Sequence, residues 1–210
     1  MRPTVHATRF LTAGALMAAL FSVPAAAAGP SPRAPAAGAY DGGYAGLYPL
    51  ADLSAQRLAT AGLVAAAKWG TGSPIDDPDR EQQVLDTAAR QAREAGTDPD
   101  ATVRIFRDQI EANKRVQRAL HRRWRLDPIS APAGRPDLAD VRKEINRVNA
   151  GLIRAIAGSG RGRAAPWCDG ALAVAQAHLR AHRLLDHLHA TALAHALRSV
   201  CGRALTASNR

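Results

Sequence analysis

The sequence predicts an all-α fold, built as a single helical domain of about six helices. Its long segments carry apolar residues at the three- and four-residue spacing of amphipathic helices, and none shows the strict alternation of a strand. Aspartate-proline pairs and glycines also divide the chain where helices would start and stop. The 210 residues are enough to bury one sizeable core.

The first residues have the pattern of a signal peptide. Arg2 and Arg9 flank a short basic start, residues 10–23 are mostly apolar, and small residues fill 25–28. We therefore expect residues 1–28 to be a cleaved signal peptide. An uncleaved membrane anchor is the alternative, but the apolar run is short against the roughly 20 residues of a membrane-spanning helix.

The domain is predicted to follow a flexible segment. Residues 29–46 are rich in Gly, Pro and Ala and lack helical period, so we expect a flexible N-terminal segment there and a helical domain over 47–207. The first helix is predicted over 49–69, where Gly70 ends it. A turn-rich loop follows over 70–75.

Aspartate-proline pairs predict the starts of the next two helices, because Asp is a good N-cap and Pro is favoured at the first helical position. The second helix is predicted over 77–96 and the third over 98–125. A proline-rich loop over 127–136 precedes a fourth helix over 137–158, and a further loop is predicted over 160–166.

The two cysteines, Cys168 and Cys201, are expected to form a disulfide, since an even number of cysteines in an exported chain usually indicates disulfide pairing. A final helical region is predicted over 169–207. One straight helix would separate the two cysteines by about 50 Å, whereas bonded cysteines need Cα atoms about 4.4–6.8 Å apart. The chain must therefore fold back, and we place this turn near residues 188–193.

The charge balance narrows the class of partner. The formal net charge is +10, yet the basic residues are scattered, and aromatic residues make up only 4% of the chain. A base-stacking surface for nucleic acid is therefore disfavoured. A small anionic substrate is favoured over nucleic acid or an anionic membrane.

Polar side chains interrupt apolar stripes that should face the core. One such residue could extend its charged end to water, but the interruption recurs in three helices, and no obvious internal acid accompanies each base. Buried cations are costly unless they are paired, so we predict a pocket for an anion, with arginines suited to carboxylates. The interrupting residues are Arg57 and Lys68, Asn113 and Gln117, and Arg142 and Asn149, and Arg80 lies in the charged first turn of the second helix.

Nothing in the sequence predicts a nucleophile, a metal or a cofactor. No Ser or Cys has an evident His partner. Because no acidic or thiolate ligand completes a recognisable set, we expect a histidine-rich surface helix rather than a metal site. The histidines in question are His178, His182, His187, His189 and His195.

An ordered set of segments resembles the all-helical (type II) chorismate mutases. They are Arg57-Leu58, residues 64–69, residues 74–81, and residues 106–110 with Asn113 and Gln117 after them. The signal peptide, the segment 124–128, Arg142 and the two late cysteines are similar to the secreted subclass.

The resemblance implies conversion of chorismate, a dicarboxylate, to prephenate by a Claisen rearrangement. Such a reaction needs no covalent intermediate, only conformational restraint and stabilisation of charge on the ether oxygen. It implies a periplasmic or secreted homodimer with one complete site per chain, no cofactor, no nucleic acid, and no membrane contact after signal cleavage.

The resemblance also implies a role for each site residue. Gln117 stands where the secreted subclass often has Glu, and Asn113 replaces a hydroxyl residue. The implied roles are carboxylate binding for Arg57 and Arg142, ordering of the substrate near the ether for Arg80, donation to the ether oxygen for Lys68 and Gln117, hydroxyl binding for Glu81 with Asp77 beside it, and a carboxylate contact for Asn113.

Two alternatives stay open at this point. An isochorismate pyruvate lyase-like activity could use a similar anion pocket on the same scaffold. A non-catalytic secreted helical binding module would instead place Arg57, Lys68 and Gln117 on the surface, facing different ways.

Overall fold

The computed structural model describes residues 37–202, which form seven α-helices and one 3-10 helix, with no strand among them. This confirms the all-α prediction. The expected signal peptide (1–28) lies outside the described residues. The elements are α1 (Ala37–Lys68), α2 (Pro78–Glu94), α3 (Pro99–Leu126), η1 (Pro128–Ser130), α4 (Leu138–Gly158), α5 (Gly160–Ala164), α6 (Cys168–His182) and α7 (His187–Ala196).

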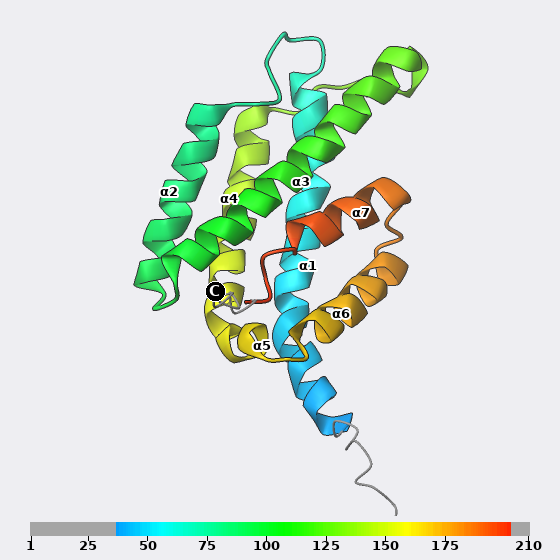
Figure 1. The fold of residues 1–210 in the computed structure, drawn as a ribbon. Helices are drawn as coiled ribbons and strands as arrows, with labels where there is room; N and C mark the ends of the chain where they lie inside the picture. The colour runs from blue at the N-terminus through cyan, green and yellow to red at the C-terminus, as the bar shows by residue number, and fades with distance from the viewer. Residues whose placement is uncertain (1–36, 203–210) are drawn as a thin grey trace, which may run out of the picture. The chain divides into compact units, whose positions relative to one another are not determined.

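Helix α1 is the element around which the others pack. It contacts α3, α4, α6 and α7, and Figure 1 shows it running between the α2–α4 group and the α6–α7 pair. Leu47, Leu50 and Ala61 on α1 are completely buried. The core therefore forms on several sides of one helix.

Helix α1 begins well before its predicted start at Pro49. Residues 37–46, part of the segment expected to be flexible, are helical. Pro49 resembles a helix start because its ring suits the first turn, yet here it lies inside the helix. Within the extension, Tyr44 packs against the core, and Leu47 is buried beside Gly162 of α5.

The predicted starts of α2, α3 and α4 are confirmed by side-chain caps. Asp77 accepts a hydrogen bond from the Arg80 amide at 3.1 Å, and Asp98 and Asp137 cap α3 and α4 in the same way. Gly96 follows α2 with φ at +69°, a conformation that favours glycine. These caps fix the ends of the helices that carry most of the site.

The C-terminal region differs from its prediction in three places. The expected loop 160–166 contains the short helix α5, and the chain reverses after His182, before the predicted turn at 188–193. The helical region predicted over 169–207 ends at Ala196, and turns follow over 197–200. The reversal uses Leu184 at a φ of +49°, and Asp186 then caps α7 through the His189 amide at 2.8 Å. Neither a glycine nor a proline marks this turn.

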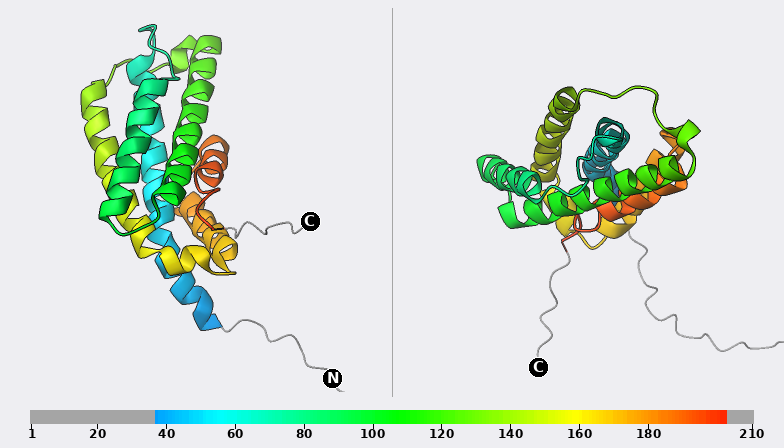
Figure 2. Two further views of the ribbon diagram at one scale, coloured as in Figure 1. Left: turned by 60° about the vertical axis from the view of Figure 1, so that its left-hand side comes forward. Right: turned by 90° about the horizontal axis from the view of Figure 1, so that it is seen from above.

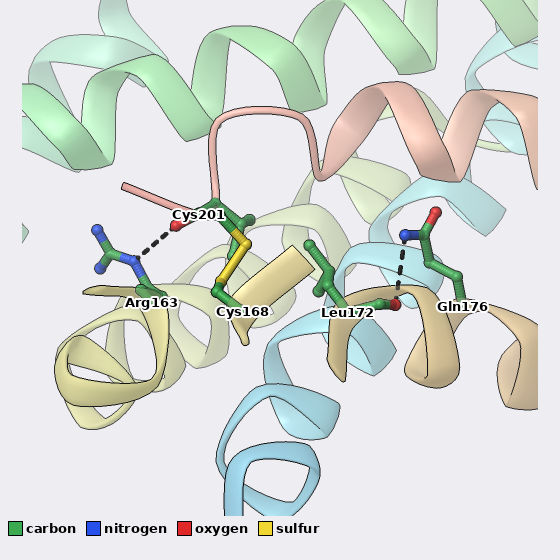
Figure 3. Close-up of a disulfide and its surroundings, with 6 residues drawn as sticks. Arg163, Cys168, Leu172, Gln176 and Cys201 are labelled. Carbon is green, nitrogen blue, oxygen red and sulfur yellow. Dashed lines mark hydrogen bonds between the residues drawn. A yellow bond between two sulfur atoms is a disulfide. The ribbon is translucent and has the colours of Figure 1, made fainter. Parts of the chain in front are cut away.

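The predicted disulfide between Cys168 and Cys201 is confirmed, with a Cα–Cα distance of 5.7 Å (Figure 3). Beside it, Arg163 donates from Nε to the Val200 carbonyl at 3.2 Å. On the other side, buried Asp108 of α3 accepts from the Arg198 guanidinium at 2.6 Å and the Ser199 amide at 3.0 Å. Residues 198–201 are therefore fixed to both α6 and α3. None of the helices in residues 37–202 is long and apolar enough to cross a membrane.

Replacement of both cysteines by serine (Cys168→Ser with Cys201→Ser) should lower the free energy of unfolding by about 3–4 kcal/mol, because the bridge closes a loop between residues 33 positions apart. Denaturant unfolding of the oxidised wild type and the double variant measures this. A reducing agent should shift the wild type and leave the variant unchanged. Equal midpoints for the two oxidised proteins would contradict the expectation.

Candidate functional site

One cleft brings together the eight residues to which the family resemblance assigns a role, whereas Asn149, which also interrupts an apolar stripe, does not line it. It lies among α1, α2, α3 and α4, which run beside one another in Figure 2. An apolar wall accompanies the polar groups, formed by Val64, Ile75, Val84, Ile110, Leu138 and Ile145. The predicted residues that line the cleft are Arg57, Lys68, Asp77, Arg80, Glu81, Asn113, Gln117 and Arg142.

Arg57 is a buried cation, only 6% exposed. Its Nε donates to the Asn149 side-chain oxygen and its Nη1 donates to the Gln109 carbonyl, both at 2.9 Å. No carboxylate of the described residues forms an ion pair with it. Burial lowers the pKa of Arg57 to about 10, so the guanidinium remains charged at neutral pH.

Lys68 is the last residue of α1 and points at the loop that follows. Its Nζ donates to the Pro74 carbonyl at 2.7 Å. Burial lowers the pKa of Lys68, Asp77 opposes this effect, and Arg142 adds to it. The ammonium group is therefore held by a backbone oxygen and not by a carboxylate.

Asp77 and Glu81 build the first turn of α2 as well as the cleft. Asp77 caps the helix through its carboxylate, and its own amide donates to Glu81 at 3.3 Å. Arg80 lies between them in sequence and donates to the Gln83 side chain at 3.1 Å. The crowded charges noted in the sequence are thus partly a helix cap and partly cleft lining.

Lys114 is a cleft residue that the sequence analysis missed. It is 8% exposed and contacts both Glu81 oxygens, at 3.0 and 2.9 Å, with Glu111 at 2.6 Å and Asp76 at 3.3 Å. Burial lowers the pKa of Lys114, but its hydrogen bonds to Glu111, Glu81 and Asp76 outweigh this, and the pKa is raised. Its position four residues after Ile110, on the edge of the same helical stripe, was the available signal.

Asn113 and Gln117 form a chain of two hydrogen bonds that begins at the backbone of α1 and leads into the cleft. The Asn113 side-chain NH2 donates to the Arg57 carbonyl at 3.3 Å, and its oxygen accepts from Gln117 Nε2 at 2.6 Å. Gln117 is 5% exposed, and its Oε1 has no hydrogen-bond partner among the described residues. Both amides are therefore oriented by the backbone of α1.

Arg142 of α4 also lines the cleft and is exposed. With Arg57, Arg80 and Lys68 it gives the cleft several cations, whereas Glu81 is already paired with Lys114. A cleft of this kind can bind an anion with more than one carboxylate through charge-assisted hydrogen bonds. Its lining contains no Ser or Cys that could serve as a nucleophile.

The predicted histidines lie away from this cleft. His178 and His182 are exposed on α6, with ring centroids 4.0 Å apart, and His187 is exposed at the start of α7. His189 and His195 are half-buried. Residues 37–202 contain no cluster of three or more His, Cys, Asp or Glu side chains able to hold a metal ion.

Both the sequence and the fold are similar to those of known proteins. Residues 49–118 match the sequence family described as chorismate mutase type II. A secreted chorismate mutase of Mycolicibacterium smegmatis is 38% identical over 155 residues, 74% of this chain and 86% of that protein. A secreted chorismate mutase of Mycobacterium tuberculosis is 36% identical over 159 residues, 76% and 80% of the two chains.

A crystal structure of a chorismate mutase from Burkholderia phymatum has a similar fold. The TM-score is 0.73 at 36% sequence identity, and the match covers 77% of this chain and 99% of that one. The match therefore extends over almost the whole of the other structure.

Replacement of Lys114 by methionine should lower the free energy of unfolding by about 2–3 kcal/mol, because it leaves Glu81 without its buried counter-charge. The exposed pair of Lys143 and Asp140 provides the control, and Lys143→Met should cost less than about 1 kcal/mol. Chemical denaturation measures both. A Lys114→Met variant as stable as Lys143→Met would contradict this account of the cleft.

Proposed function

The chain belongs to the type II chorismate mutase family, and on this basis we propose that its α1–α4 cleft converts chorismate to prephenate. The observation that carries the proposal is the cleft itself. Residues from four separate segments, chosen from the sequence alone, line one pocket. This arrangement argues against a binding module whose cations face different ways.

The cations of the cleft fit the two carboxylates of chorismate. Arg57 is buried and held in place by hydrogen bonds to α3 and α4, and exposed Arg142 of α4 lines the same cleft. A guanidinium can bind a carboxylate through two parallel hydrogen bonds, which fixes direction as well as position. Arg80, at the mouth formed by α2, would order the part of the substrate nearest the ether. Asn113 would add a polar contact to a carboxylate.

The reaction breaks the ether C–O bond while a C–C bond forms within the same molecule. Negative charge grows on the ether oxygen, so donors aimed at that atom lower the barrier. Lys68 supplies an ammonium. Gln117 supplies an amide whose Nε2 carries two hydrogens, of which one is used by Asn113 and the other is free for the ether oxygen.

Restraint of the substrate is the second contribution. The two ends of chorismate must approach each other before they can bond, and holding them close removes most of the entropic cost. The apolar wall, through residues such as Val64, Val84 and Ile110, would pack against the substrate ring. Glu81, with Asp77 beside it, would accept a hydrogen bond from the ring hydroxyl. No covalent intermediate is required.

The setting of the enzyme is also part of the proposal. The signal peptide predicted over residues 1–28, the disulfide and relatives named as secreted support export to the periplasm or beyond. The family resemblance implies a homodimer. Because all eight residues with an implied role line one cleft within a single chain, we propose that each chain carries a complete site.

The Lys68→Ala variant should lose kcat by roughly 100- to 1000-fold, because it removes a donor to the developing oxyanion. The measurement is the decrease of chorismate absorbance with purified oxidised protein. Lys143→Ala, at an exposed position on α4, should leave the rate unchanged. A folded wild type that releases pyruvate from isochorismate but does not consume chorismate would favour the lyase activity instead.

The Gln117→Glu variant should gain a dependence on acid pH that the wild type lacks. The new carboxyl would face the Asn113 oxygen in a buried site, so its pKa should rise, and only its protonated form can donate. Activity of the variant is therefore present below this raised pKa and lost as the pH rises through it. Profiles of kcat/KM from pH 5 to 8 measure the difference, and a steep loss in the wild type would refute it.

A further inference from the structure

Asn149 interrupts the apolar stripe of α4, yet none of the roles described above uses it. It lies next to a separate polar groove between α2 and α4, together with Arg80, Arg90 and Asn146, and does not line the cleft proposed to bind substrate. Its side-chain oxygen accepts from Arg57 Nε at 2.9 Å. Asn149 thus contacts Arg57, a residue proposed to bind substrate, without lining the cleft itself.

The partners of Arg57 share one property, which is that they carry no charge. The second is the backbone carbonyl of Gln109, at 2.9 Å from Nη1. Gln109 is itself fixed, since its side chain donates to the Ser54 hydroxyl at 2.8 Å and the Ala196 carbonyl at 3.2 Å. The guanidinium is therefore held from α3 and α4 at once.

Neutral partners matter because Arg57 is almost fully buried. A buried guanidinium would normally pair with an acid, and the pairing would cancel most of its field. Elsewhere in this cleft the protein does use acids, as Glu81 and Glu111 show around Lys114. Lys114 is thus neutralised internally, whereas Arg57 is not.

We propose that Asn149 is a positioning residue that fixes the Arg57 guanidinium with a neutral oxygen and so leaves its charge to the substrate carboxylate. The inference rests on the proposed function of the cleft. Asparagine and aspartate have nearly the same shape, and both offer an oxygen to Nε. They differ in whether the arginine is neutralised before substrate arrives.

The Asn149→Asp variant separates this role from a structural one. It keeps the acceptor but adds a competing carboxylate, so we expect KM for chorismate to rise about tenfold or more, with a smaller change in kcat. Asn149→Ala removes the acceptor without adding charge and should raise KM by about two- to fivefold. A structural role gives the reverse order, since the aspartate retains the hydrogen bond that alanine loses.

Asn146→Asp is the matched control. Asn146 is exposed, lies three residues earlier on α4 beside the same groove, and makes no side-chain hydrogen bond within residues 37–202. It adds the same charge without touching Arg57, so its KM should stay within about twofold of wild type. Thermal unfolding of all variants shows that each is folded, and Asn149→Asp should melt at or above Asn149→Ala.

The outcomes of these experiments separate a failure of the proposed role of Asn149 from a failure of the proposed function of the cleft. An active wild type with KM unchanged in Asn149→Asp, or with alanine more harmful than aspartate, overturns the role of Asn149 alone. A KM order of aspartate above alanine above wild type supports it. A folded wild type that does not consume chorismate overturns the proposed function, and this inference with it.

Discussion

The position of α1 constrains the rest of the structure. Because α3, α4, α6 and α7 all pack against it, the polar residues on its buried faces find their hydrogen-bond partners within the protein. Arg57 donates to α3 and α4. Ser54 accepts from Gln109 of α3, and its own hydroxyl donates to the Leu50 carbonyl of α1. Packing around α1 therefore builds both the core and the cleft. Arg57, which is buried and also lines the cleft, belongs to both.

Helix α3 contacts both the first helix of the domain, α1, and the segment after α7. Gln109 binds the last residue of α7, and Asp108 binds the segment after α7, which the disulfide joins to α6. The same turn of α3 presents the carbonyl that holds Arg57. The C-terminal helices add no residue to the cleft lining. Their contribution is mechanical, because α7 packs against α3 and α6 packs against α1 without lining the cleft.

Local signals explain what the sequence predicted well. Aspartate caps and a helix-ending glycine set the limits of α2, α3 and α4, and these depend only on neighbouring residues. The continuation of α1 through Pro49 and the reversal at Leu184 depend on distant packing, which local propensity does not describe. The site residues were found because polar groups on apolar stripes are costly, together with the family resemblance. Their partners, such as Asn149 for Arg57, depend on how α1, α3 and α4 approach one another.

The entrance to the cleft is built from the end of a helix. Asp77 caps α2 and lines the cleft, and Glu81 supports the same turn while it holds Lys114. Helix ends open more readily than helix centres, so this turn belongs to the least protected part of α2. An occupant that binds only the folded turn must lower the population of its frayed state, by an amount set by the occupant's concentration relative to its Kd. Amide hydrogen exchange in the first turn of α2 thus becomes a direct gauge of occupancy, linking recognition to the local melting of a single helical turn.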